Sequence, residues 1–180
     1  QLLVVPGGFS YADALGAGKL LALDLASYFA DEISTFVESG KPVIGICNGF
    51  QALVKSGILP STTGRGARGE GATLTFNSQG HFECRWVTLK PVSKKCVWTK
   101  DLVDLIECPI AHGEGNFQTS PLFPLSSFIE HNQIAITYTY PNGTPANGDY
   151  PINPNGSIQD IAGICNPLGN VLGLMPHPEN

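Results

Sequence analysis

The chain has 180 residues, 42% of them hydrophobic and 14% charged, which suits one domain with a sizeable core. Its net charge of −5 and its lack of a Lys/Arg cluster argue against nucleic acid or an anionic membrane as a partner. It has no apolar run of membrane-spanning length, and its five cysteines form no C-x-x-C pair, so we expect a cytoplasmic protein without a disulfide framework or a metal site.

The first predicted element is a buried strand at residues 1–5, followed directly by Pro6, Gly7 and Gly8. Consecutive glycines let backbone N–H groups approach a ligand with no side chain in the way, so Gly7 and Gly8 are candidate donors to an oxyanion. An ordinary tight turn explains the same three residues, and the motif alone is a weak signal.

After a loop at residues 9–18, the apolar spacing predicts one long helix over residues 19–37 that ends at Gly40. Its apolar face would consist of Leu20, Leu23, Ala26, Ala30, Ile33 and Val37. With the strands before and after it, this helix would form a right-handed crossover between parallel strands.

The next predicted strand, at residues 43–46, reads Val-Ile-Gly-Ile, and it is too short and too β-branched to be a helix. A helix follows it, because Phe50, Leu53 and Val54 recur at i, i+3 and i+4, and Gly57 ends the pattern. Cys47 is therefore expected on the sharp turn between a buried strand and a helix.

Cys47 in this position has the features of a nucleophile. Gly45 and Gly49 on either side leave room for the strand and the helix to approach, and the elbow holds the cysteine in a strained backbone conformation. The helix N-terminus favours the thiolate, so we expect a lowered pKa, and the N–H of Asn48 faces the space where an oxyanion would form. A buried structural cysteine explains the same stretch, which does not by itself choose between the two.

The middle of the chain changes pattern after Pro60. Residues 61–71 are polar and glycine-rich, so we predict a loop in which Arg65 and Arg68 are solvated rather than bound to an acidic partner. Strands are then predicted over residues 72–76, 82–89 and 96–99, as an antiparallel excursion from the main sheet.

A strand at residues 105–110 ends in the segment Ala-His-Gly-Glu-Gly at 111–115. His112 and Glu114 resemble a second catalytic pair, but a general base must reach the nucleophile, and a better candidate lies later in the chain. We predict a substrate-side or interface loop here, with a purely structural turn as the alternative, and we expect His81 and His131 at the surface.

The last third of the chain contains a strand at residues 134–140, a long loop at 141–157 of the kind that carries function, and a hairpin over 158–165 and 171–175. The final strand leads into Pro-His-Pro-Glu at residues 176–179. The two prolines hold His177 at the carboxyl end of its strand, the edge of the sheet that Cys47 also leaves.

Glu179 is close enough in sequence to bind the imidazole of His177 and fix its tautomer. Cys47, His177 and Glu179 thus form a predicted set of nucleophile, base and orienting carboxylate. We expect one α/β domain over residues 1–180, whose N-terminal βα portion and C-terminal tail lie outside these residues.

Three segments resemble the signatures of class I glutamine amidotransferases: Pro6-Gly7-Gly8, Gly45-Ile-Cys-Asn-Gly-Phe-Gln51 and Met175-Pro-His-Pro-Glu179. Within that class, four more resemble the glutaminase subunits of phosphoribosylformylglycinamidine synthases: Gly8-Phe-Ser-Tyr11, Phe82-Glu-Cys-Arg-Trp86, Ala111-His-Gly-Glu-Gly115 and Tyr150-Pro-Ile-Asn-Pro-Asn-Gly-Ser157. The resemblance spans the whole chain. It departs from the family after Glu179, where a basic residue usually follows.

The resemblance implies a flavodoxin-like three-layer sandwich, with a mostly parallel sheet and an antiparallel excursion. It implies hydrolysis of glutamine by Cys47, His177 and Glu179, with Gly7, Gly8, Asn48 and Gln51 on the substrate side. It also implies that ammonia passes to a large synthetase subunit, with a small bridging subunit, in purine biosynthesis. No cofactor is expected in this chain, because ATP and Mg²⁺ are used by the synthetase.

Two other classes of function remain open. A cysteine-elbow hydrolase of the same broad fold acting on another substrate would share Cys47, but such enzymes normally carry a His directly after the nucleophile, where this chain has Asn48. A non-catalytic interaction module would need no triad, and its Cys47 would show no special thiol reactivity.

Overall fold

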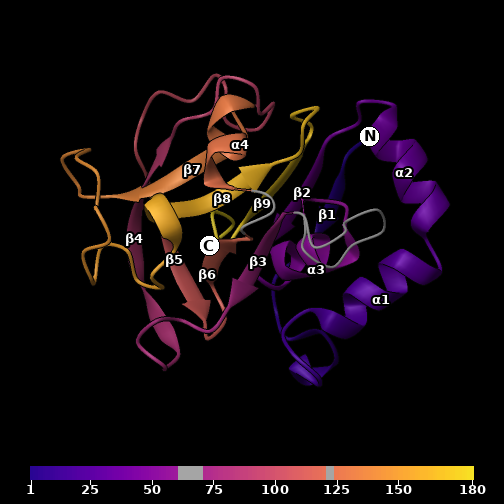
Figure 1. Ribbon diagram of the computed structural model, residues 1–180, viewed down its shortest axis with the longest axis horizontal. Helices are drawn as coiled ribbons and strands as arrows, with labels where there is room; N and C mark the ends of the chain where they lie inside the picture. Colours follow the sequence, from indigo (N-terminus) through magenta and orange to yellow (C-terminus); the bar gives the residue numbers. More distant parts are fainter. Residues whose placement is uncertain (61–70, 121–123) are drawn as a thin grey trace.

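The computed structural model describes residues 1–60, 71–120 and 124–180, so the predicted loop with Arg65 and Arg68 lies almost entirely outside the described residues. A seven-stranded sheet has the order β1-β2-β9-β8-β7-β4-β5, and a smaller sheet pairs β3 with β6 (Figure 1). The strands are β1 Leu3–Val5, β2 Val43–Ile46, β3 Ala72–Thr75, β4 Glu83–Pro91, β5 Ile106–His112, β6 Asn116–Thr119, β7 Ile134–Thr139, β8 Ile161–Cys165 and β9 Val171–Leu174.

Three neighbouring strands of the main sheet are parallel. β1 and β9 both pair with β2 in parallel, and Ile46 at the end of β2 stands beside Leu174 at the end of β9. The segments that carry Gly7, Cys47 and His177 therefore leave adjacent strands at the same carboxyl edge, as predicted.

The rest of the main sheet is antiparallel. β9 forms the predicted hairpin with β8, and β8–β7, β7–β4 and β4–β5 are antiparallel pairs as well. β4 therefore belongs to the main sheet, and the antiparallel part extends further than an excursion from it. Strand β6 was not predicted; it pairs with β3 in antiparallel fashion.

The predicted strand at residues 96–99 is wrong, because this segment is a turn. The hydroxyl of Ser93 accepts hydrogen bonds from the N–H groups of Lys95 and Cys96, each at 3.1 Å, and this local bonding replaces a strand ladder.

The helices are α1 Lys19–Ser27, α2 Ala30–Glu38, α3 Asn48–Ser56 and α4 Leu125–Glu130, with 3₁₀ turns η1 Ser10–Asp13 and η2 Ile158–Asp160. The single helix predicted over residues 19–37 is wrong: Phe29 leaves the helical region (φ −123°, ψ 14°), and a second helix begins with Asp31 and Glu32 in its first turn. In Figure 1, α1 and α2 lie beyond the β1 end of the sheet. No helix within the described ranges is long and apolar enough to cross a membrane.

Helix α3, which follows β2, packs closely on the parallel strands β2 and β9. Phe50 and Leu53 are fully buried, and a Cβ on Gly45 would lie 2.5 Å from Cδ1 of Leu53 and 2.9 Å from the backbone of Gly49. Gly173 in β9 leaves the space that the Phe50 ring fills. The elbow after β2 therefore depends on glycines where the helix meets the sheet.

Candidate active site

The turn at Cys47 has the strained geometry that the sequence predicts. Cys47 caps the N-terminus of α3 with φ 49° and ψ −106°, a backbone conformation that residues other than glycine rarely adopt. Its N–H donates to the carbonyl of Leu174 at 2.8 Å, which ties the elbow to the end of β9. Neighbouring structure thus fixes the cysteine at the carboxyl edge.

The thiol of Cys47 is a weaker acid than we predicted. Burial raises its pKa to about 12, with Asp13 and Glu179 adding to the rise, and only the backbone N–H of Asn48 opposes it. The prediction of a lowered pKa is wrong because dehydration of the thiolate outweighs the field of the helix N-terminus. The protonated Sγ lies 3.6 Å from the carbonyl oxygen of Ala111, to which it donates. Ionisation of Cys47 therefore needs a base.

His177 lies beside this cysteine with its tautomer fixed. Its Nδ1 is 2.7 Å from Oε1 of Glu179, as predicted, and its backbone N–H donates to the carbonyl of Pro109 at 2.8 Å. Because the carboxylate accepts the Nδ1 proton, Nε2 keeps its lone pair. Nε2 is buried and has no hydrogen-bond partner among the described residues, so it is available to take a proton.

The turn after β1 packs against both the base His177 and the nucleophile Cys47. A Cβ on Gly7 would lie 2.7 Å from Cε1 of His177 and 3.4 Å from Cβ of Cys47. Gly8 has φ +127°, which only glycine adopts without strain. Gly7, Cys47 and His177 are thus mutual neighbours, as their places at the ends of β1, β2 and β9 predict.

The side chains of Asn48 and Gln51 bind other parts of the chain. Oδ1 of Asn48 accepts from the N–H of Ser10 at 3.1 Å, and its Nδ2 donates to Asp13 at 2.9 Å and to Oε1 of Gln51 at 3.1 Å. Nε2 of Gln51 donates to the carbonyl of Glu114 at 2.6 Å. These hydrogen bonds hold the loop after β1 and the 111–115 segment against α3. Contact of Gln51 with the substrate stays a prediction.

A pocket of about 170 Å³ opens beside these residues. Its lining includes Gly8, Cys47, Gln51, His112 and Glu114. Phe9 and Phe82, whose ring centroids are 6.4 Å apart, also line it. Larger hollows of about 300 and 670 Å³ lie along α2 and beside β1, but they contain neither a cysteine nor a histidine.

Sequence reasoning missed the backbone groups that complete the site. The carbonyls of Pro109 and Ala111 in β5 accept from His177 and Cys47, although β5 is the last strand in the order of the sheet. The sheet therefore curls so that its far edge meets the catalytic residues. The described residues contain no group of three or more His, Cys, Asp or Glu side chains arranged to hold a metal ion.

Comparison with known proteins agrees with this geometry. The model of the CobB/CobQ-like glutamine amidotransferase domain matches residues 1–180. Phosphoribosylformylglycinamidine synthase subunit PurQ of Treponema denticola is 60% identical over 191 residues, with 100% of this chain and 71% of that protein covered. PurQ of Methanococcus maripaludis strain C7 is 44% identical, with 99% and 65% covered. The chain thus spans about two thirds of the length of these relatives.

Among solved structures, PurLQS from Thermotoga maritima superposes with a TM-score of 0.73 at 34% identity, over 99% of this chain and 68% of the matched one. A glutamine amidotransferase from the same organism, at 18% identity and a TM-score of 0.52, supports the fold alone. The predicted α/β amidotransferase fold is confirmed by both. The chain belongs to the family of CobB/CobQ-like glutamine amidotransferase domains.

Proposed function

We propose that this chain is the glutaminase part of a phosphoribosylformylglycinamidine synthase, which hydrolyses glutamine to glutamate and ammonia. The observation that carries the proposal is the convergence of Cys47, Gly7 and the His177–Glu179 pair at one sheet edge. Proteins named as PurQ subunits match this chain almost from end to end, which supports the same assignment.

In the first half of the reaction, Sγ of Cys47 attacks the side-chain amide carbon of glutamine while Nε2 of His177 takes the thiol proton. This order suits a cysteine that burial keeps protonated at rest. The oxyanion is held by the N–H of Asn48 and by the turn at Gly7 and Gly8. His177 then gives its proton to the amide nitrogen, the C–N bond breaks, and ammonia leaves a glutamyl thioester on Cys47.

In the second half, His177 removes a proton from water, which attacks the thioester and releases glutamate. Glu179, 2.7 Å from Nδ1, stabilises the imidazolium that forms in both halves. Its carboxylate keeps the imidazole in the tautomer that presents Nε2 to the reacting atoms.

We further propose that the ammonia passes to a PurL-type synthetase subunit, with a small PurS-type bridging subunit. There it would convert formylglycinamide ribonucleotide to formylglycinamidine ribonucleotide at the expense of ATP with Mg²⁺. The Thermotoga maritima structure that superposes on this chain is that of PurLQS, which supports such an assembly. A reducing cytoplasm suits the five free thiols of the chain.

Cys47→Ala in the complex with the synthetase tests this function. Glutamine-dependent synthesis should fall to background, while synthesis from added ammonia continues, because the synthetase accepts ammonia from any source. Cys84→Ala, at an exposed cysteine, is the matched control and should change neither rate. Loss of the ammonia-dependent rate in Cys47→Ala would refute the assignment of Cys47.

A further inference from the structure

A second histidine of the pocket has no role in the steps above. His112 ends β5 directly opposite Glu83 of β4, and its side chain is only 2% exposed. It lines the same pocket as Cys47. A Cβ on Gly115 would lie 2.5 Å from Nδ1 of His112, so the chain needs a glycine there to admit the ring.

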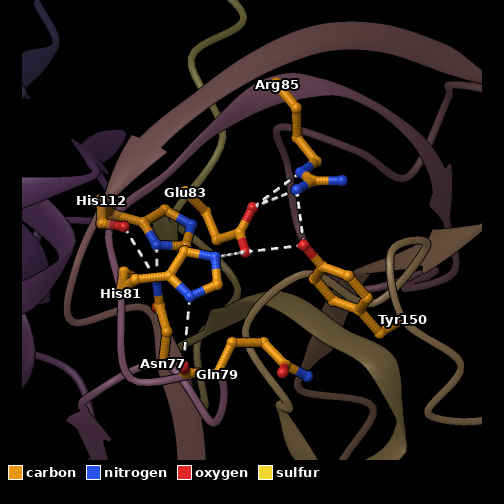
Figure 2. Close-up of polar contacts among 7 residues, drawn as sticks. All are labelled: Asn77, Gln79, His81, Glu83, Arg85, His112 and Tyr150. Carbon is orange, nitrogen blue, oxygen red and sulfur yellow. Dashed lines mark hydrogen bonds and ion pairs between the residues drawn. The ribbon is translucent and has the colours of Figure 1, made fainter.

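Asn77 fixes the tautomer of this imidazole (Figure 2). Nδ2 of Asn77 donates to the carbonyls of His81 and His112, at 3.0 and 2.8 Å, so its Oδ1 faces the ring and the N–H of Gly115. Oδ1 lies 3.1 Å from Nδ1 of His112 and can only accept. Nδ1 therefore carries the proton, and Nε2 presents a lone pair.

Nε2 of His112 is buried and has no hydrogen-bond partner among the described residues. Glu83 is paired with His112 across the two strands, but its carboxylate binds other side chains, as Figure 2 shows. Its Oε1 lies 2.9 Å from Nε2 of His81 and accepts from the hydroxyl of Tyr150 at 3.2 Å. Its Oε2 accepts from Nη2 and Nε of Arg85, at 2.6 and 2.7 Å. A buried acceptor without a partner costs free energy, and a ligand that donates a hydrogen bond to it would remove that cost.

His112 is neutral across the physiological range. Burial, and after it the charge of His177, lower its pKa to about 4, although Glu83 acts in the opposite direction. The thiol of Cys47 donates to the carbonyl of Ala111, the residue before His112, at 3.6 Å, so this end of β5 lies next to the nucleophile. A ring that stays neutral does not donate a proton from Nε2, so what it can offer a ligand there is acceptance of a hydrogen bond.

We propose that Nε2 of His112 accepts a hydrogen bond from the side-chain amide nitrogen of glutamine and keeps this bond as that nitrogen becomes ammonia. The proposal rests on the proposed glutaminase function. The amide nitrogen has two hydrogens and gains a third from His177, and the C–N bond breaks after the bond from Cys47 to carbon has formed. His112 takes no proton. It selects a leaving group that carries N–H.

Two variants separate the acceptor from the rest of the ring. His112→Asn keeps an N–H near the position of Nδ1, within reach of Asn77, and removes Nε2. His112→Gln extends an amide to the position of Nε2 and restores an acceptor there. Each is assayed in the complex with the synthetase on glutamine and on glutamate γ-methyl ester, whose leaving group has no N–H.

For His112→Asn we expect kcat/KM for glutamine to fall about tenfold, the effect of one hydrogen bond made in the transition state, with the ester rate nearly unchanged. His112→Gln should recover most of the glutamine rate. An equal loss on both substrates, or no advantage of Gln over Asn, would overturn the proposal. If wild-type protein hydrolysed the ester but not glutamine, the proposed function would fail instead.

A measurement on wild-type protein covers the case in which neither variant folds. In protein labelled with ¹⁵N-histidine, the NMR signal of His112 at pH 7 should show a protonated Nδ1 and an unprotonated Nε2. A proton on Nε2 would overturn the proposal, because that nitrogen could not then accept a hydrogen bond.

Discussion

Gly7 and His177 lie so close together that only a glycine fits at residue 7. A Cβ there would stand 2.7 Å from Cε1 of the imidazole. Real Cβ atoms do not approach other heavy atoms this closely, so either the ring or the turn would have to move. The β1 turn thus shapes the space in which His177 works, in addition to its expected part in holding the oxyanion.

Gly7→Ala should therefore lower glutamine-dependent kcat by at least about tenfold, because displacement of the base disturbs proton transfer in both halves of the reaction. Ammonia-dependent synthesis should stay normal. Gly40→Ala is the control for stability, since Gly40 has φ +75° far from the site and nothing within 4 Å of its added Cβ. Full glutaminase activity in Gly7→Ala would show that the ring tolerates the collision.

His177 and Glu179 should differ in how much they contribute to the glutaminase rate. His177→Ala should lower the glutaminase rate at least about 100-fold, because the base moves a proton in both halves of the reaction. Glu179→Gln should cost less, since an amide oxygen can still accept from Nδ1 and hold the ring. Steady-state glutaminase assays of both variants in the complex test this order, and an equal or reversed loss would assign Glu179 another role.

His112 should make the fold sensitive to acid. Its pKa is about 4 in the folded chain and near 6.5 when unfolded, so below pH 6.5 the unfolded state binds more protons and stability falls as the pH falls towards 4. The loss is on the order of a few kcal/mol at most. Chemical denaturation between pH 7 and 4 should show a shallower decline for His112→Asn than for wild type, and parallel declines would mean that other groups control it.

The free subunit should be a poor glutaminase that its synthetase activates. Glutamine hydrolysed with no acceptor nearby is wasted, and the 111–115 segment beside Cys47 is held by contacts, such as Gln51 to Glu114, that docking can reset. Full-length protein should turn glutamine over faster when the synthetase and its nucleotide substrate are added. An unchanged rate would contradict this coupling.

The parts of the site that follow from local patterns were predictable. The β2 strand, the α3 helix and the β9 strand have short, regular signals, and the rule that ligands bind at the carboxyl edge places Cys47 next to His177. The pair His177–Glu179 is close in sequence, so its contact needed no knowledge of the fold.

Other features depend on the folded surroundings. Cys47 has a raised pKa because the structure buries it, which the helix position alone does not reveal. Leu23 was expected on a buried face but is 60% exposed, because α1 turns the neighbouring Ala22 towards the core instead. Asn77 gave no signal, since its role depends on where His112 and Gly115 come to lie.

The carbonyls of Pro109 and Ala111 also bear on how the enzyme acquires its activity. Cys47 and His177 are 130 residues apart in the sequence (177 − 47), and both meet β5, which in the described part of the chain pairs with β4 alone. Such distant contacts form slowly, because long loops must close first. Catalytic competence should therefore be among the last properties to emerge during refolding, after most helical signal has returned, so that a half-folded subunit consumes no glutamine.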